Sequence, residues 1–131
     1  MSDSIFTKII RGDIPSYKIL ENENFISFLD INPIKEGHTL VVPKLQVDYI
    51  YDLPNDIFNG LFNFSKLVAQ KLERAIECDR IGISVVGLEV PHAHIHLIPI
   101  NEISDMSFEN QRIHLSQIEF QNILKKINSS N

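Results

Sequence analysis

Apolar residues recur along the 131-residue chain with two different periods, which separate the predicted helices from the predicted strands. The longest helical pattern runs over Pro54–Glu77, where apolar side chains repeat every three or four residues and charged side chains lie off that stripe. A shorter helix is predicted for Ser4–Arg11, ending at Gly12. Another begins near Ser116, which has the spacing of a capping box with Glu119. We therefore expect a long central helix and a shorter one towards each end.

Five short segments rich in β-branched and aromatic residues have the composition of β-strands. They are Tyr17–Glu21, Phe25–Leu29, His38–Val42, Arg80–Val86 and His94–Ile100. Short turns join the first three, which favours antiparallel pairing. The order α-β-β-β-α-β-β-α lacks the regular strand–helix alternation of a doubly wound sheet. The pattern predicts one α+β domain with a mainly antiparallel sheet.

Composition and charge exclude several classes of function. The chain has 12 Lys and Arg against 17 Asp and Glu, a net charge of −5. It lacks the basic face that a general nucleic-acid binder needs, whereas a single nucleotide needs only a local site. No run of apolar residues approaches the roughly 18 of a membrane span, so no membrane partner is expected. The one cysteine, Cys78, excludes an intrachain disulfide and fits a reducing, cytoplasmic location.

The most informative segment is Pro91–Pro99, in which His92, His94 and His96 alternate with apolar residues. Successive side chains of a strand point to opposite faces, so the three imidazoles share one face and the apolar residues between them face the core. Imidazole can act as nucleophile, base or acid near neutral pH. The pattern by itself leaves three interpretations open: a metal site with imidazole ligands, a phosphoryl-transfer site, or a solvated strand with chance histidines.

Three further motifs precede the histidines at consistent spacing: Ile5–Pro15 (IFTKIIRGDIP), Phe28–Pro33 (FLDINP) and Gly37–Lys44 (GHTLVVPK). Together the four motifs cover about residues 5 to 100. They resemble the histidine triad (HIT) family of nucleotide hydrolases and transferases, and within it the purine-nucleoside phosphoramidase branch. The resemblance implies a single HIT domain over residues 1–131, with a five-stranded antiparallel sheet and a C-terminal extension, 101–131, that carries the last helix. It also implies a homodimer, formed through the Pro54–Glu77 helix and a sheet edge.

The resemblance assigns a catalytic role to four histidines. His94 would attack the α-phosphorus, forming a nucleotidyl-histidine that water then hydrolyses. Its other nitrogen would donate to a backbone carbonyl, that of His92. His92 and His96 would line the phosphate site, and His38 would lie near the leaving group or buttress the triad. The covalent step requires no metal or cofactor.

The resemblance also implies a purine nucleoside monophosphate, or its phosphoramidate or anhydride derivative, as ligand. Asp30 would accept hydrogen bonds from the ribose hydroxyls, and the alternative for this residue is a turn-capping role before Asn32-Pro33. Residues expected to sandwich the base, or to serve only as core, are Phe6, Ile9, Ile14, Phe28, Leu29 and Ile31.

The segment Val85–Val90 departs from the phosphoramidase branch. It is shorter, with Leu88 where a glutamine is expected and Glu89 where a serine is expected. The substrate's leaving group is therefore left open. The alternatives are a dinucleoside polyphosphate hydrolase, a nucleotide-binding module with little turnover, and a histidine-based metal-binding protein.

Overall fold

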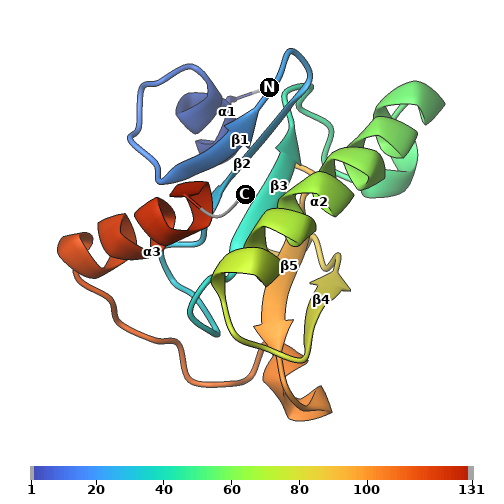
Figure 1. Cartoon of the computed structure of the whole chain (residues 1–131). Helices are drawn as coiled ribbons and strands as arrows, with labels where there is room; N and C mark the ends of the chain where they lie inside the picture. Colours follow the sequence, from blue (N-terminus) through green and yellow to red (C-terminus); the bar gives the residue numbers. More distant parts are fainter. Residues whose placement is uncertain (1, 130–131) are drawn as a thin grey trace.

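The computed structural model describes residues 2–129, in which a five-stranded sheet carries helices on both faces (Figure 1). The strands pair antiparallel throughout, in the spatial order β1-β2-β3-β5-β4. These findings confirm the predicted α+β class and the five-stranded antiparallel sheet. The strands are β1 (Lys18–Glu21), β2 (Phe25–Leu29), β3 (Thr39–Pro43), β4 (Arg80–Ser84) and β5 (Ile95–Ile100). The helices are α1 (Ile5–Ile10), α2 (Asn55–Ala75) and α3 (Gln117–Ser129), with short 3-10 helices η1 (Ile50–Asp52) and η2 (Ile103–Met106).

The sheet separates two apolar clusters, because alternate residues of each strand point to opposite faces. On one face, Phe25 and Leu29 of β2 and Val41 of β3 pack with α2 and α3. On the other face, Phe28 of β2 packs with Phe6 of α1. The three central strands β2, β3 and β5 are therefore buried on both sides. A strand with a fully buried second face can hold functional side chains away from water.

The long helix α2 lies across the sheet (Figure 1). It packs against the sheet through a stripe of buried, mostly apolar side chains. Leu61, Val68 and Leu72 of that stripe are fully buried. The helix begins one residue later than predicted and ends at Ala75, because Ile76 is already extended and leads towards β4. Among residues 2–129, no helix combines the length and the apolar character needed to cross a bilayer.

The last helix, α3, begins with the capping box that the sequence predicts. The Ser116 hydroxyl accepts from the Glu119 amide at 3.1 Å, and the Glu119 carboxylate accepts from the Ser116 amide at 2.9 Å. Residues 107–116, between η2 and α3, form an irregular segment. Before Ser116, the sequence pattern predicts neither a helix nor a strand there. The Ile113 amide of this segment donates to the Pro33 carbonyl at 2.9 Å, so the segment returns to the loop that follows β2.

The histidines lie on the face opposite the α2 cluster, and the apolar residues between them belong to that cluster, as predicted. Of the three interpretations left open, the solvated strand is wrong, because His92, His94 and His96 are only 0%, 4% and 8% exposed. The ring of Phe6 contacts His92 and His94, with centroids 5.8 and 4.9 Å apart. Phe108, in the irregular segment, contacts His96 at 4.7 Å. Only His96 lies within β5, because the other two histidines precede the strand.

Two glycines with positive φ provide a stability test. Gly37 (φ +91°) leads into β3, and a Cβ atom there would meet buried Ile76 and the ring of Pro99. Gly12 (φ +83°) follows α1, and its Cβ would meet nothing within 4 Å. Gly12→Ala is expected to lower the free energy of unfolding by about 1–2 kcal/mol through backbone strain. Gly37→Ala should cost about 1–3 kcal/mol more, through overpacking. Urea unfolding measures both variants, and equal losses would contradict the proposed clash.

Candidate active site

Three neighbouring strands bring the predicted histidines and Asp30 to one face of the sheet. Asp30 follows the last residue of β2, His38 directly precedes β3, and His94 directly precedes β5. β3 lies between β2 and β5, and its Leu40 is paired with His96. Since side chains two residues apart share a face, these positions converge beneath α1. Residues separated by up to 66 positions in the chain thereby form one site.

His94 has one nitrogen fixed and one free. Its Nδ1 lies 2.8 Å from the backbone oxygen of His92, the hydrogen bond that the sequence analysis expects. A carbonyl oxygen can only accept, so Nδ1 carries the proton and Nε2 keeps its lone pair. Burial lowers the pKa of His94, against the opposing effect of this hydrogen bond. The imidazole is therefore held neutral near pH 7, in the tautomer whose Nε2 can act as a nucleophile.

His92 lies behind His94 and is completely buried. Its Nε2 donates to the backbone oxygen of Pro43 at 2.8 Å, and its Nδ1 accepts from the hydroxyl of Ser4 at 2.6 Å. With both nitrogens occupied, His92 has no donor for a phosphate, so its expected place in the phosphate site is wrong. It acts as a positioning residue, through the carbonyl that orients His94.

Ser4 is a functional contact that the sequence analysis missed. Its hydroxyl oxygen also accepts from the Thr7 amide at 3.0 Å and so caps α1. The Ser4 amide donates to the Gln46 side chain at 2.9 Å. One hydroxyl therefore joins the start of α1 to the histidine that positions His94. The only sequence signal was the place of Ser4 at the start of a predicted helix, which indicates a cap and no more.

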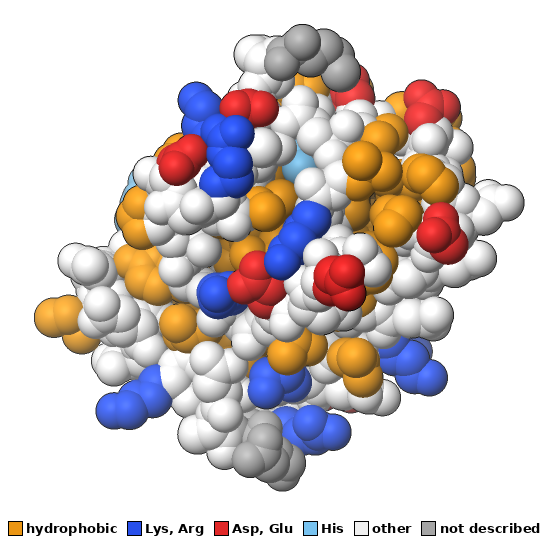
Figure 2. Space-filling model, turned by 90° about the horizontal axis from the view of Figure 1, so that it is seen from above, with side chains coloured by type: hydrophobic (Ala, Val, Ile, Leu, Met, Phe, Trp, Pro, Cys, Tyr) orange, Lys and Arg blue, Asp and Glu red, His pale blue; other side chains and the backbone are white. Residues whose placement is uncertain are grey.

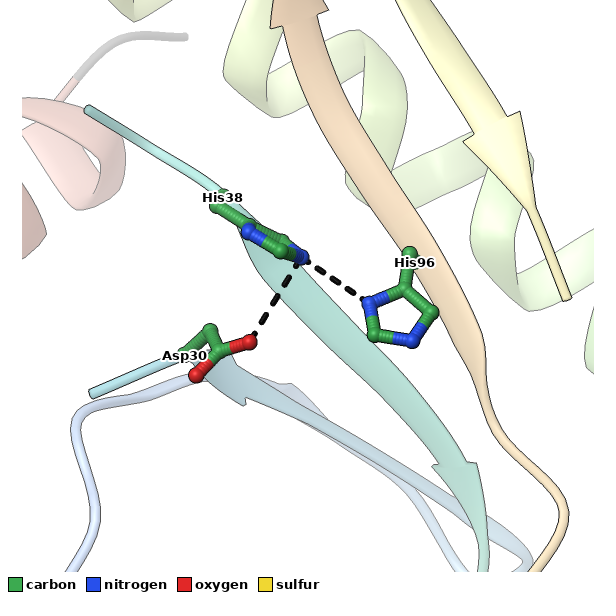
Figure 3. Close-up of side chains that lie close together, drawn as sticks. All are labelled: Asp30, His38 and His96. Carbon is green, nitrogen blue, oxygen red and sulfur yellow. Dashed lines mark hydrogen bonds and ion pairs between the residues drawn. The ribbon is translucent and has the colours of Figure 1, made fainter. Parts of the chain in front are cut away.

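His38 and His96 form a directed pair (Figure 3). The Ile34 amide donates to Nδ1 of His38 at 3.0 Å, which leaves the proton of His38 on Nε2. Nε2–H of His38 therefore donates to Nδ1 of His96 at 2.9 Å, so His96 carries its own proton on Nε2. In the described part of the chain no side-chain nitrogen is both buried and unpaired, so this N–H is open to the adjoining pocket. Of its two expected places, His38 takes the one behind the triad, as a buttress.

Burial sets the charge of this pair. It lowers the pKa of both His38 and His96 to about 3, and the positive charge of Arg112 acts in the same direction. Both imidazoles are therefore neutral at physiological pH. His96 presents a neutral N–H donor, without the cost of burying a cation.

The two carboxylate oxygens of Asp30 have different surroundings, one in the turn after β2 and one beside His38. Oδ1 accepts from the Asn32 amide at 2.8 Å, which is the turn-capping role considered for this residue. Oδ2 lies 3.5 Å from Nε2 of His38 (Figure 3). Burial raises the pKa of Asp30, while the Asn32 amide and the Arg112 charge oppose that rise. One oxygen remains able to accept a hydrogen bond from a ligand.

Asp30, His38 and His96 also offer three ligand atoms within 4.8 Å of one another, which is close enough to hold a metal ion. The donor chemistry does not favour such a site. The Ile34 amide requires a lone pair on Nδ1 of His38, which puts a proton on the nitrogen that would ligate the metal. The Ile34 amide, His38 and His96 instead form a chain of directed hydrogen bonds.

A pocket of about 320 Å³ opens beside His94 and His96, and we call it the main pocket. Its size and its mainly apolar wall suit a small organic ligand. All seven residues expected to contact the nucleotide line it: Phe6, Ile9, Ile14, Phe28, Leu29, Asp30 and Ile31. The structure thus brings together every predicted binding residue, although Phe6 and Phe28 also belong to the core cluster under α1.

Two lining residues come from the irregular segment after η2, outside every motif. Phe108 packs its ring against His96, and Arg112 holds its guanidinium 5.8 Å from the Phe108 ring centre. Nη1 of Arg112 donates to the Asn32 carbonyl at 2.7 Å. The sequence analysis missed both residues, because an isolated Phe and Arg in a segment without periodicity carry no signal.

A second, aromatic pocket of about 300 Å³ lies on the other side of His94. Tyr49, Tyr51, Phe58 and Phe62 line it with Val85 and the exposed Leu88. Figure 2 shows hydrophobic side chains gathered on the right of that view, the side on which Figure 1 places the start of α2. Val86, Gly87 and Leu88 line both pockets, so the segment that departs from the family pattern forms the ridge between them.

The hydrogen bonds predict a specific set of tautomers. Imidazole ¹⁵N NMR should find the Nδ1–H form for His94 and the Nε2–H form for His92, His38 and His96 at neutral pH. His38 and His96 should remain neutral down to about pH 3. In the unfolded chain they take up protons near pH 6.5, so the free energy of unfolding should fall as pH drops from about 6.5 towards 3. Titration of either imidazole near 6.5 in the folded protein would contradict this arrangement.

The HIT domain family matches residues 11–103 of the chain. Protein hit of Bacillus subtilis is 38% identical over 104 residues, 72% of this chain and 69% of that protein. The adenosine 5'-monophosphoramidase HNT1 of Saccharomyces cerevisiae is 35% identical over 100 residues, 72% of this chain and 61% of that protein. The crystal structure of a Hit-like protein involved in cell-cycle regulation from Bartonella henselae superposes with a TM-score of 0.84 at 30% identity, covering 97% of this chain and 95% of the other. The chain therefore belongs to the HIT domain family.

Proposed function

We propose that the protein is a nucleotide hydrolase that cleaves a phosphoramidate or phosphoanhydride bond at a nucleoside 5'-phosphate. The observation that carries the proposal is the state of His94. Its Nδ1–H is bonded to the His92 carbonyl at 2.8 Å, and its Nε2 lone pair is available in a side chain that lines the main pocket. The relatives' names support the same chemistry, since one of them is an adenosine 5'-monophosphoramidase.

The reaction proceeds in two displacements at phosphorus. Nε2 of His94 attacks the α-phosphorus, the Nε2–P bond forms, and the bond to the leaving nitrogen or oxygen breaks with its electron pair going to that atom, which takes up a proton. Water then attacks the same phosphorus, the Nε2–P bond breaks, and the water's proton is lost to solvent. The His92 carbonyl stabilises the positive charge that His94 carries in the intermediate. The Nε2–H of His96 donates to a phosphoryl oxygen.

The nucleoside occupies the apolar part of the main pocket. The base lies between aliphatic and aromatic side chains such as Ile9 and Phe28, where a purine buries more surface than a pyrimidine. The ribose hydroxyls reach Oδ2 of Asp30, the oxygen that the turn leaves free. This arrangement places the 5'-phosphate towards the histidines.

The leaving group is an amine in this proposal, and a polyphosphate is the second candidate. Glu89 lines the main pocket beside the ridge, and its negative charge opposes the lowering of the His94 pKa by burial. A carboxylate there repels a polyphosphate and attracts an ammonium group. Leu88 is 88% exposed on the ridge and offers a leaving group only apolar contact. Phosphoramidate hydrolysis is therefore favoured over the cleavage of dinucleoside polyphosphates.

The first prediction tests the nucleophile. His94→Ala should lower turnover of adenosine 5'-phosphoramidate by more than the roughly 10²–10⁴ that loss of a general acid alone would cause. Adenosine monophosphate should still bind, because Asp30 and the apolar side chains expected to hold the nucleoside are unchanged. The matched control is His114→Ala, at an exposed histidine that lines none of the pockets described here. Near-normal turnover of His94→Ala on every nucleotide tested would overturn the mechanism.

Ribose recognition is tested at Asp30. Asp30→Asn keeps the size of the side chain and removes its charge, so the charge-assisted bonds to the ribose hydroxyls are lost at a cost of about 1.5–3 kcal/mol. Adenosine monophosphate should therefore bind more weakly to the variant, while its 2',3'-dideoxy analogue should bind almost as before. Calorimetric titration of both ligands makes the comparison. Equal weakening of both would assign Asp30 to the turn alone.

A homodimer is part of the proposal, supported by an exposed apolar edge. β4 is an edge strand, and Ile83 within it is 50% exposed. Val85, directly after β4, lines the aromatic pocket together with Tyr51, which is 72% exposed, and the aromatic side chains at the start of α2. A stable interface here should bury at least about 1,000 Å².

Light scattering at micromolar concentration should give twice the chain mass of 15.0 kDa. Ile83→Lys should convert the dimer to a monomer, because it puts a charge on the edge strand. Ile118→Lys is the matched control, at an isoleucine of α3 that is 68% exposed. A wild-type protein that scatters as a monomer would refute the dimer.

A further inference from the structure

We propose that Arg112 binds the phosphate group of the substrate in the main pocket, and that it selects nucleotides over nucleosides. This inference rests on the proposed function only in taking the main pocket as the nucleotide site. It assigns a role to the irregular segment between η2 and α3, which lies outside the four motifs. The ligand group concerned is a phosphoryl anion, as a monoester, a phosphoramidate or an anhydride.

A phosphate in the main pocket needs a positive charge nearby, because two of the three charged residues that line the pocket are acids. Arg112 is the only Lys or Arg among them. The other ionisable lining residues are two acids, Asp30 and Glu89, and two imidazoles, His94 and His96. Burial keeps both imidazoles neutral at physiological pH, so they offer no positive charge. Without Arg112, a phosphate would enter a pocket that carries two carboxylates and no cation.

Two contacts hold the guanidinium, and a third fixes the backbone beside it. Nη1 donates to the Asn32 carbonyl at 2.7 Å, and the Phe108 ring supports the group at 5.8 Å. The next residue, Ile113, donates its amide to Pro33 at 2.9 Å. A guanidinium has five N–H donors in a planar fork, and the Asn32 carbonyl takes one of them. The rest of the fork suits two phosphate oxygens at once.

The segment also places Arg112 near the other phosphate donor. The centre of the Phe108 ring lies 4.7 Å from the centre of the His96 imidazole and 5.8 Å from Cζ of Arg112. His96 offers its free Nε2–H to the same pocket. A neutral donor and a cation thereby flank one aromatic ring, and both line the space beside His94. The charge of Arg112 opposes the rise that burial causes in the pKa of Asp30, and it adds to the fall that burial causes in the pKa of His96.

The test compares a charged ligand with its uncharged counterpart. Adenosine monophosphate and adenosine are titrated calorimetrically into full-length wild-type protein and into Arg112→Gln, Arg112→Lys and Arg74→Gln. Arg74→Gln removes the same charge from an exposed position on α2 and is the matched control. Arg112→Gln should weaken adenosine monophosphate by about tenfold or more, the loss of a charge-assisted hydrogen bond. Adenosine should bind within about twofold of wild type, since it has no phosphate to lose the contact.

Arg112→Lys should fall between wild type and Arg112→Gln, because it keeps the charge and loses the fork. For the wild type, rising salt should weaken the monophosphate and leave adenosine almost unchanged, a readout that needs no variant to fold. An unchanged affinity of Arg112→Gln for the monophosphate, or an equal loss for both ligands, would overturn the inference. A wild-type protein that binds neither ligand would instead refute the nucleotide site itself, and with it the proposed function.

Discussion

The requirement that every buried imidazole nitrogen find a partner organises this site. Four histidines are packed away from water between the sheet, α1 and the segment after η2, and a buried polar atom without a hydrogen bond is costly. A backbone oxygen can only accept and a backbone amide can only donate, so each backbone contact dictates a tautomer. The Pro43 and His92 carbonyls set His92 and His94, and the Ile34 amide sets His38 and, through it, His96. The same contacts leave one lone pair on His94 and one donor on His96 facing the main pocket.

These hydrogen bonds and ring contacts connect distant parts of the fold to His94. The Ser4 hydroxyl caps α1 and also donates to His92, while Phe6, two residues later, packs against His92 and His94. The helix that supplies part of the pocket wall therefore also supports the residue that orients His94. A change at the start of α1 would alter both the shape of the main pocket and the orientation of His94. The same turn supplies Phe6 to the pocket wall and the Ser4 hydroxyl that holds His92.

The two sides of His94 differ in character, and under the proposed function nucleotide recognition and leaving-group choice depend on different residues. The main pocket combines an apolar wall with Asp30, Arg112 and the imidazole donors. The aromatic pocket across the ridge has four aromatic rings and a single acid, Asp48. The ridge itself carries Leu88, at the position where the resemblance leads one to expect a polar residue. Under the proposed function, the ridge can therefore change without altering the residues that bind the nucleotide.

Local pattern in the sequence was sufficient for the elements and for the face that the histidines occupy. The three- and four-residue spacing in α2, the Ser116–Glu119 capping box and the period of two around His94 each depend on neighbours within a few residues, and the structure has all three. The family resemblance of the motifs likewise indicated Asp30 and six apolar residues that line the main pocket, since all seven lie within the matching motifs.

Only the tertiary structure decided what covers that face and which nitrogen of each histidine is free. Ser4 and His92 are 88 residues apart, and Arg112 and Asn32 are 80 apart. A hydrogen bond over such a distance leaves no periodic trace in the chain, because it arises when a helix and an irregular segment close over the sheet. The sequence therefore indicated three imidazoles on one face, whereas the closure of the fold made them buried, neutral and directed, and brought a single arginine to the pocket beside them.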